Sequence, residues 1–365
     1  MKNIFNFFKK TNSFSDRVDS PEDRVKAFIS HWHEQWSKAR KKMGENVDFD
    51  YWGNQISEVD ETHFITGRSS GSRNSIGLAP DYDPKTEKIT ECEIDGEIAQ
   101  VFTEIYQESR KFSKYHVYEL VRDVESGWKI TDIFTLFHPP KSSVIDVNKH
   151  AEILAMSSED APFMERAKHI DLNENTLFQK VRNIKTPHLD EGEARLERIG
   201  NLRISSGVVG ILDFGYDIYD FEPLHRKIKP GEYPVETVTI HDRVAGIRVK
   251  FSDSEEPIKW HAANTPSGNG VYGVDAGNLA IFDVSKLMVL NRIGKEKIFN
   301  GWCISGKPEL VSMTSTNDCV ISTSGFGDGA YPAYWGVNKQ DEVISLYIDF
   351  MILVKENENG IYESI

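Results

Sequence analysis

The chain has 365 residues, 39% of them hydrophobic and 11% aromatic, so it is long enough for two globular cores. Its formal net charge of −14 repels phosphate backbones and argues against nucleic-acid binding. Residues 151–365 carry 32 acidic against 22 basic side chains, a net charge of −10 that favours a basic protein partner.

The cysteines and the N-terminal residues indicate the cellular compartment in which the protein is expected. Cys92, Cys303 and Cys319 are odd in number and form no Cys-x-x-Cys pair, which favours a reducing compartment without a disulfide framework or a thiolate zinc site. Residues 1–10 lack the apolar core of a signal peptide, and no run approaches the roughly 18 apolar residues of a membrane helix. We therefore expect a cytoplasmic protein without membrane contact, and an N-terminal tail at residues 1–19.

A long amphipathic helix is predicted to start at Ser20-Pro-Glu-Asp23, where Ser20 caps, Pro21 suits the first turn and Asp23 completes a capping box. Apolar side chains then recur on one stripe at helical spacing. They are Val25, Phe28, Ile29, Trp32, Trp36 and Met43. A shorter helix is expected at residues 49–59.

Two consecutive hairpins follow these helices. Strands are predicted at residues 88–94, 97–106, 115–124 and 128–137, with turns at Asp95-Gly96 and Glu125-Ser-Gly127. The order of elements predicts an α+β unit in which a curved antiparallel sheet wraps a helix. With the Trp-rich first helix and the closing Gly127-Trp-Lys-Ile-Thr-Asp-Ile-Phe134 strand, residues 20–138 resemble the NTF2-like fold, and more narrowly the NTF2-fold immunity proteins of bacterial toxin systems.

That resemblance implies a cone with an interior pocket, in a domain that runs from residue 20 to residue 140. The side chains expected to line the pocket are Trp32, Trp36, His63, Trp128 and Asp132. Strand alternation places Asp132 on the face of Trp128, and in enzymes of this fold a carboxylate inside the cone can act as a general base. The alternative is a solvated cavity mouth, or a bond from Asp132 to His31, His63 or His116. His31 and His33 point to different sides of their helix, so we expect no metal there.

Residues 141–194 are polar and weakly periodic, and they predict a partly helical linker with helices near 147–156 and 173–181. Residues 195–365 predict an all-β, sandwich-like domain. Its strands are expected at residues 202–213, 235–240, 244–251, 258–263, 271–274, 279–284, 319–323 and 343–354. The glycine-rich stretch Gly268–Gly273 is expected to be a hairpin turn.

Five short motifs of this domain occur in the order found in an uncharacterised bacterial family. They are Gly231-Glu-Tyr-Pro-Val235, Arg243-Val-Ala245, Gly273-Val-Asp-Ala-Gly277, Gly327-Asp-Gly-Ala-Tyr-Pro332 and Asp349-Phe350. Residues 195–355 therefore resemble the family called domain of unknown function 4241, which implies no activity.

The stretch Gly325–Gly336 combines four glycines with four aromatic residues and predicts a loop. Exposed aromatic side chains and backbone N–H groups in such a loop form a recognition surface. The residues expected to bind a partner or ligand are Asp275, Asp328, Tyr331, Tyr334 and Trp335. The alternative is that Asp328 caps its own turn while the aromatic side chains fill the core.

Four aspartates of the β domain suggest a second hypothesis. Asp275, Asp283, Asp328 and Asp349 supply the oxygen ligands that a divalent cation or a hydrolase needs, although their spacing matches no calcium loop. For Asp349 the favoured interpretation is a structural ion pair with Arg243, with Arg248 as the other available arginine.

These patterns lead to two main functional hypotheses. The first is a cytoplasmic bacterial immunity protein that neutralises a cognate basic toxin by occlusion, with no metal and no cofactor. The second is an aspartate-dependent hydrolase or small-molecule binder that uses the β domain, with or without a divalent metal. A scaffold that bridges two partners is a weaker third hypothesis. The oligomeric state stays open, with a homodimer through the NTF2-like domain as one arrangement.

Overall fold

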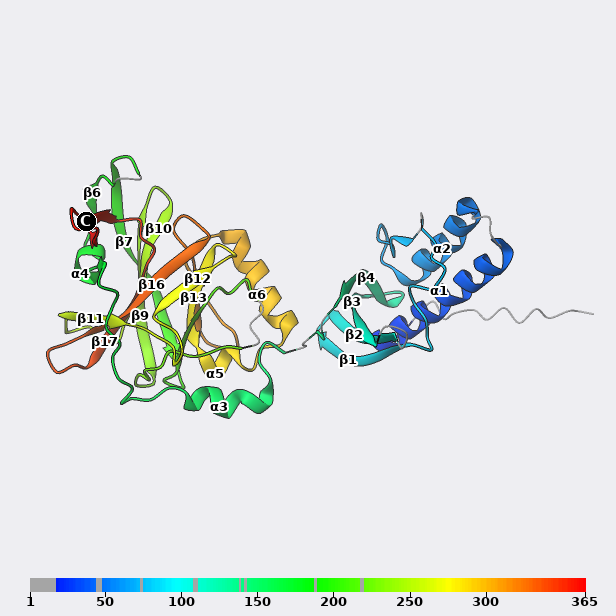
Figure 1. The fold of residues 1–365 in the computed structure, drawn as a ribbon, viewed down its shortest axis with the longest axis horizontal. Coiled ribbons are helices and arrows are strands. Elements are labelled where there is room, and N and C mark those ends of the chain that lie inside the picture. Colours follow the sequence, from blue (N-terminus) through cyan, green and yellow to red (C-terminus); the bar gives the residue numbers. More distant parts are fainter. Residues whose placement is uncertain are drawn as a thin grey trace, which may run out of the picture. The chain divides into compact units, whose positions relative to one another are not determined.

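A computed structural model describes residues 18–43, 48–72, 75–107, 111–137, 139–140, 143–186, 189–216 and 220–365. The chain divides into two compact units, Met1–Ser142 and Ser143–Ile365, which we describe separately (Figure 1). Of the tail predicted at residues 1–19, only Val18 and Asp19 lie within the described residues.

The first unit is an α+β structure in which two helices precede four strands. The elements are α1 (Pro21–Met43), α2 (Phe49–His63), β1 (Glu87–Asp95), β2 (Ile98–Gln107), β3 (Phe112–Asp123) and β4 (Gly127–Leu136). The strands form one antiparallel sheet in the order β1-β2-β3-β4. The element order agrees with the sequence prediction, and the first hairpin turn lies one residue later than expected, at Gly96-Glu97.

The core of the first unit lies between α1, α2 and the sheet. Val25, Phe28 and Trp32 of α1 are buried there, and the rings of Trp32 and Trp52 meet edge to face with centroids 5.6 Å apart. Arg24 is also fully buried, and its guanidinium donates to the carbonyl oxygen of Trp128 at 2.6 Å. The apolar stripe predicted from the sequence therefore packs α1 against the sheet.

The second unit is mostly β-structure. Its helical elements are η2 (Val147–Lys149), α3 (His150–Ala155), α4 (Glu174–Leu177), α5 (Val284–Leu287) and α6 (Arg292–Ser305). Its strands are β5 (Ile170–Asp171), β6 (Arg182–Ile184), β7 (Gly192–Ile204), β8 (Val209–Leu212), β9 (Gly231–Ile240), β10 (Arg243–Lys250), β11 (Lys259–Ala262), β12 (Val271–Val274), β13 (Asn278–Asp283), β14 (Glu309–Val311), β15 (Cys319–Thr323), β16 (Gly329–Val337), β17 (Val343–Asp349), β18 (Val354–Glu356) and β19 (Tyr362–Ser364).

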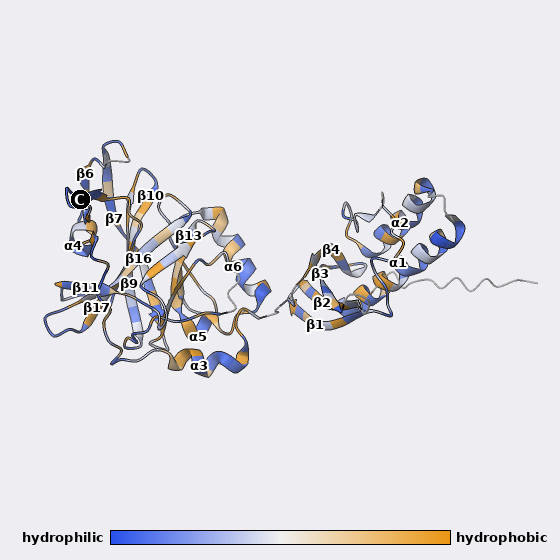
Figure 2. Ribbon diagram, in the orientation of Figure 1, coloured by the Kyte–Doolittle hydropathy of each residue, from blue (hydrophilic) through white to orange (hydrophobic). Residues whose placement is uncertain are grey.

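Two sheets share the main core of this unit. The larger sheet has the order β11-β16-β17-β10-β9-β7-β6, with β12 also paired to β16, and the smaller one has the order β14-β15-β13-β8. Alternate residues such as Ile247, Leu346 and Ile281 bury their side chains in this core. A second cluster contains residues of the other face of the smaller sheet together with residues of α3, α5 and α6. Figure 2 shows apolar and polar residues on different sides of α3 and α6, as expected for helices with one buried face.

The opposite face of the larger sheet packs against two other segments of the chain. Leu172 and Leu177, together with Ile352 and Leu353, bury this face in a separate cluster. The two covering segments are joined because β19 pairs in parallel with β5, in the small sheet β18-β19-β5. Residues 143–186, predicted to be a linker, thus belong to the second unit.

The structure corrects three expectations for the second unit. Residues 329–336, predicted to be part of a loop, lie in the largely buried strand β16, between β11 and β17. The predicted strand at residues 343–354 is interrupted after Asp349, because Met351 has a left-handed φ of 57°. The 14-residue helix α6 was not expected in a domain predicted to be all β.

Candidate functional site

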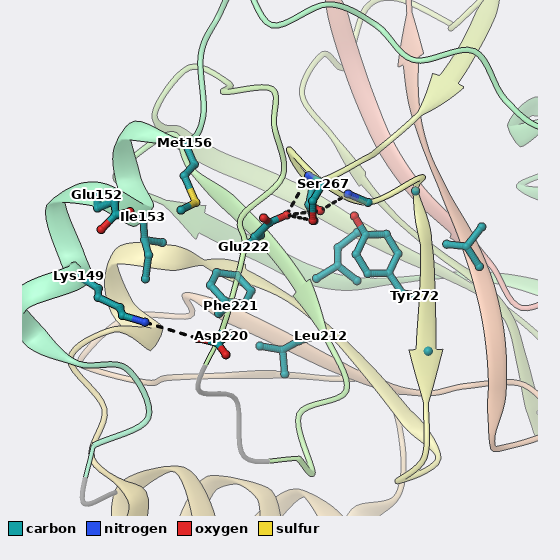
Figure 3. Close-up of a pocket in the computed structure, with 16 residues that line it drawn as sticks. Lys149, Glu152, Ile153, Met156, Leu212, Asp220, Phe221, Glu222, Ser267 and Tyr272 are labelled. Atoms are coloured by element: carbon teal, nitrogen blue, oxygen red, sulfur yellow. Dashed lines mark hydrogen bonds and ion pairs between the residues drawn. The ribbon is translucent and has the colours of Figure 1, made fainter.

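A pocket of about 600 Å³ opens in the second unit beside α3 (Figure 3). Its wall on one side is α3, and on the other the loop before β12 together with β12 itself. Residues 220–222 and the end of β8 complete the lining. In Figure 3, Ile153 of α3 and Met156, just after this helix, project toward Phe221 and Glu222.

The helical side of the pocket is fixed by local sequence signals. The side chain of Asp146 accepts from the backbone N–H of Asn148 at 2.9 Å and caps the turn that leads into α3. Ile153 is buried in the cluster beneath the helix, so α3 is anchored to the smaller sheet. Met156, one residue beyond α3, is left partly exposed at the pocket.

Glu222 is the most strongly organised polar group of the pocket. Its Oε2 accepts three hydrogen bonds, from the Ser267 hydroxyl (2.7 Å), the Thr265 hydroxyl (2.8 Å) and the Ser267 backbone N–H (3.0 Å). The Ser267 hydroxyl, followed by that backbone N–H and Thr265, holds the pKa of Glu222 below its usual range. Oε1 makes no hydrogen bond within the described residues. Glu222 is therefore a fixed carboxylate with one oxygen available.

Two further acidic side chains lie at the pocket, and they are exposed. They are Glu152 of α3 and Asp220, beside a single lysine, Lys149. Lys149 Nζ lies 3.4 Å from Asp220 Oδ1 (Figure 3). The charged residues of the lining therefore sum to about −2, and the pocket has a negative potential.

Tyr272 contributes an apolar ring surface to the pocket. Its hydroxyl donates to the carbonyl oxygen of Ala263 at 2.6 Å, so the polar end of the side chain is already bonded. The strand that carries Tyr272 begins after Gly270, which has a φ of +81° and lies against the backbone of Ala262 and Ala263. A side chain at residue 270 would displace this turn, and with it the ring.

The arrangement suits binding better than bond-making chemistry. An ionised carboxylate among apolar surfaces attracts an organic cation. The hydroxyls of Ser267 and Thr265, which line the pocket, both donate to Glu222 and so hold this carboxylate in place. Across the described ranges, no group of three or more His, Cys, Asp or Glu side chains is placed to hold a metal ion.

The residues predicted from Gly325–Gly336 do not form a recognition loop. Tyr331 (6% exposed) and Trp335 (1%) lie in the main core, and Tyr334 (2%) lies in the cluster on the opposite face of the larger sheet. Asp275 and Asp328 are exposed. The alternative interpretation, in which the aromatic side chains fill the core, describes these three residues, whereas Phe326 of the same stretch is 49% exposed.

The predicted ion pair between Asp349 and Arg243 is absent from the described structure. Arg243 is exposed, and its Nη1 donates to the carbonyl oxygen of Gly325 at 3.2 Å. Arg248 instead pairs with Glu236 at 2.6 Å and with the buried Glu174 at 3.3 Å. The four aspartates proposed as metal ligands do not gather at one site within the described residues. Asp283, for example, is the N-cap of α5, next to the smaller sheet.

Asp349 is a fully buried carboxyl group, and no described residue places a countercharge in contact with it. Its Oδ1 accepts from the Met351 N–H at 2.8 Å, while Oδ2 has no partner. Burial raises the pKa of Asp349 to about 7. Tyr347, on the same face of β17, has a buried hydroxyl that also lacks a partner.

In the first unit, the residues predicted to line a pocket belong mostly to the core. Trp32 and Trp128 are buried. Trp36 is partly buried, and its indole N–H donates to the carbonyl oxygen of Gly77 at 3.2 Å. Burial lowers the pKa of His63 to about 2, with the charge of Arg24 as the next cause. His63 is therefore a neutral core histidine.

Strand alternation predicted that Asp132 lies on the same face of the sheet as Trp128. The structure places the two side chains on different faces. A β-bulge shifts the register between the pairs Glu119–Asp132 and Leu120–Ile130. Because one extra residue reverses the alternation beyond it, the carboxylate of Asp132 is 45% exposed, 3.7 Å from Arg68 Nη1.

The comparisons with known proteins bear on the second unit. Residues 202–348 match the family model described as "Protein of unknown function (DUF4241)", in agreement with the resemblance found in the sequence. No curated protein and no solved structure is significantly similar to the chain. The NTF2-like resemblance of residues 20–138 stays a prediction.

The matched range includes Glu222, Ser267 and Tyr272 of the pocket, whereas α3 lies before it. No helix within the described ranges has the length and apolar character required to cross a membrane.

Proposed function

We propose that this chain is an immunity-type binding protein, which neutralises a basic bacterial protein toxin in the cytoplasm of the producing cell by occluding it. The observation that carries the proposal is the pocket beside α3, where Glu152, Asp220 and Glu222 surround apolar surface. Such a surface accepts a positively charged partner and excludes an anionic one.

The charge of the whole chain supports the same partner. The second unit is strongly acidic, and a negative potential speeds the encounter with a basic protein and rejects nucleic acid. Inhibition by occlusion needs an oriented binding surface, and the three hydrogen bonds to Oε2 of Glu222 orient its carboxylate. The resemblance of residues 20–138 to NTF2-fold immunity proteins points to the same class of function.

The proposal is tested by capture and protection. The tagged full chain is used to capture partners from cells of its source at low ionic strength, and each partner is then expressed alone and together with the chain. We expect a basic partner that stops growth when expressed alone and that the chain renders harmless. We also expect an association rate that falls steeply with added salt.

A charge-matched control separates specific binding from general attraction. An unrelated acidic protein of similar net charge replaces the chain in the same growth and capture experiments. Protection by both proteins, or a set of partners of which none is toxic, would refute the proposal.

A small-molecule binder is the second candidate, because the pocket volume of about 600 Å³ lies within the usual range for ligand sites. Calorimetric titration with Mg²⁺, Ca²⁺ and Mn²⁺ tests the version that uses a metal. Heat of binding together with a raised melting temperature would favour it over the immunity function.

A further inference from the structure

We infer that the pocket beside α3 binds an aliphatic cation, the ammonium or guanidinium side chain of a lysine or arginine residue of the partner, with Glu222 as the anionic anchor. The inference rests on the proposed function, since it names the chemical group by which a basic partner is recognised.

The first argument is the geometry of Glu222. Three donors from Thr265 and Ser267 hold Oε2, at 2.7 to 3.0 Å, and thereby fix the orientation of the carboxylate. Oε1 is left with its hydrogen-bonding capacity unused in the described structure. A carboxylate that is already oriented loses little conformational freedom when a cation binds.

The second argument is the apolar surface around this charge. Ile153 of α3, Met156 just after this helix, Phe221 and the ring of Tyr272 all line the pocket. The methylene groups of a lysine or arginine side chain pack against such surfaces while the charged end reaches a carboxylate. A bare inorganic cation would leave this surface without a contact.

The third argument concerns the other charges. Asp220 and Glu152 add negative potential at the pocket, and the nearby Lys149 lies within ion-pair distance of Asp220. A divalent metal needs several free oxygen ligands converging on one point. Here Oε2 of Glu222 is occupied by donors, so a monovalent organic cation fits better.

The experiment is a calorimetric titration of the full-length protein with agmatine, which carries a guanidinium group and an ammonium group on a four-carbon chain. The neutral analogue N-butylurea and the peptide acetyl-Gly-Arg-Gly-amide are titrated alongside. We expect binding of agmatine and of the peptide, and no binding of N-butylurea. Equal binding of agmatine and N-butylurea, or no binding of agmatine, would overturn the inference.

Two variants locate the site. Glu222→Gln removes the charge, keeps an oxygen for the Thr265 and Ser267 donors, and should lower the affinity for agmatine about tenfold or more. The matched control Glu256→Gln makes the same change at an exposed glutamate outside the pocket and should leave the affinity unchanged. An equal effect of both substitutions would contradict the inference.

Gly273→Leu provides a second route if Glu222→Gln impairs folding. Gly273 lines the pocket, and a Cβ added there meets no atom within 4 Å. The leucine side chain should occupy pocket space and weaken agmatine binding while the melting temperature is retained. Unchanged affinity for agmatine in this folded variant would contradict the assignment of the pocket as the binding site.

The same variants separate the inference from the proposed function. If agmatine binding depends on Glu222 but no toxic partner is found, the inference that the pocket binds an organic cation is retained and the immunity function is refuted. Full protection from a toxin by a Glu222→Gln variant, together with the absence of agmatine binding, refutes the inference and retains the function.

Discussion

The substitution Asp349→Asn should change how the stability of the second unit depends on pH. In the native state the Asp349 carboxyl has a pKa of about 7, against 3.8 for an unperturbed aspartate side chain. A raised native pKa means that the unfolded state releases its proton first, so stability is lost as pH rises from about 4 to about 7 and is constant above that range.

The magnitude follows from the difference between the two pKa values. At about 1.4 kcal/mol for each pKa unit, ionised Asp349 lowers the free energy of unfolding by about 4 kcal/mol above pH 7. More than half of this change, about 2–3 kcal/mol, falls between pH 5 and pH 7.5. Asparagine keeps an oxygen for the Met351 N–H but buries an amide group without an acceptor, at a cost of about 1–3 kcal/mol.

We therefore expect Asp349→Asn to be close to the wild type at pH 5 and more stable by about 1–3 kcal/mol at pH 7.5. Urea titrations followed by hydrogen exchange of β17 peptides measure this free energy for the second unit alone. Asp328→Asn, an exposed substitution of the same type, is the control and should follow the wild type at every pH. If the free energies of unfolding of the wild type and of Asp349→Asn changed with pH in parallel, the reasoning would be refuted.

Three further substitutions test the packing, each by urea unfolding combined with hydrogen exchange. Arg248→Met leaves the buried Glu174 without its cation and should destabilise the second unit by about 3–5 kcal/mol, and retention of full stability would contradict the ion-pair argument. Gly336→Ala should cost about 1–3 kcal/mol, because the new Cβ collides with the Ser345 hydroxyl, and Gly301→Ala on α6, where nothing lies within 4 Å, is the control. Arg24→Lys should destabilise the first unit alone by about 2–3 kcal/mol, because one ammonium group cannot reproduce the spread of guanidinium bonds.

The order of elements could be predicted from the sequence where local signals were strong. The capped start of α1 and the glycine at the β1–β2 turn located their elements closely. Helix α6 was missed because Gly294 and Gly301 weaken its helical pattern, although its end signals were present. Asn291 caps it at 2.7 Å from the Gly294 N–H, and Gly306 ends it with a φ of 57°.

The candidate site could not be predicted, because its parts are distant in sequence. Glu222 acquires its role only when Thr265 and Ser267 lie beside it, and neither is marked by a motif. Strand alternation also failed at Asp132, since a single bulge reverses the face and leaves no trace in the residue pattern. Pairings between remote segments are decided by tertiary packing.

The parallel pairing of β5 with β19 also has a consequence for how the protein is made. Asn173 donates its backbone N–H to the hydroxyl of Ser364, 191 residues further along the chain. A ribosome that adds 5–20 residues per second needs about 10–40 s to cover that distance. During this interval Leu172 and Leu177 are exposed without the strand that later covers them, so the nascent chain offers a chaperone an apolar target that the finished protein lacks.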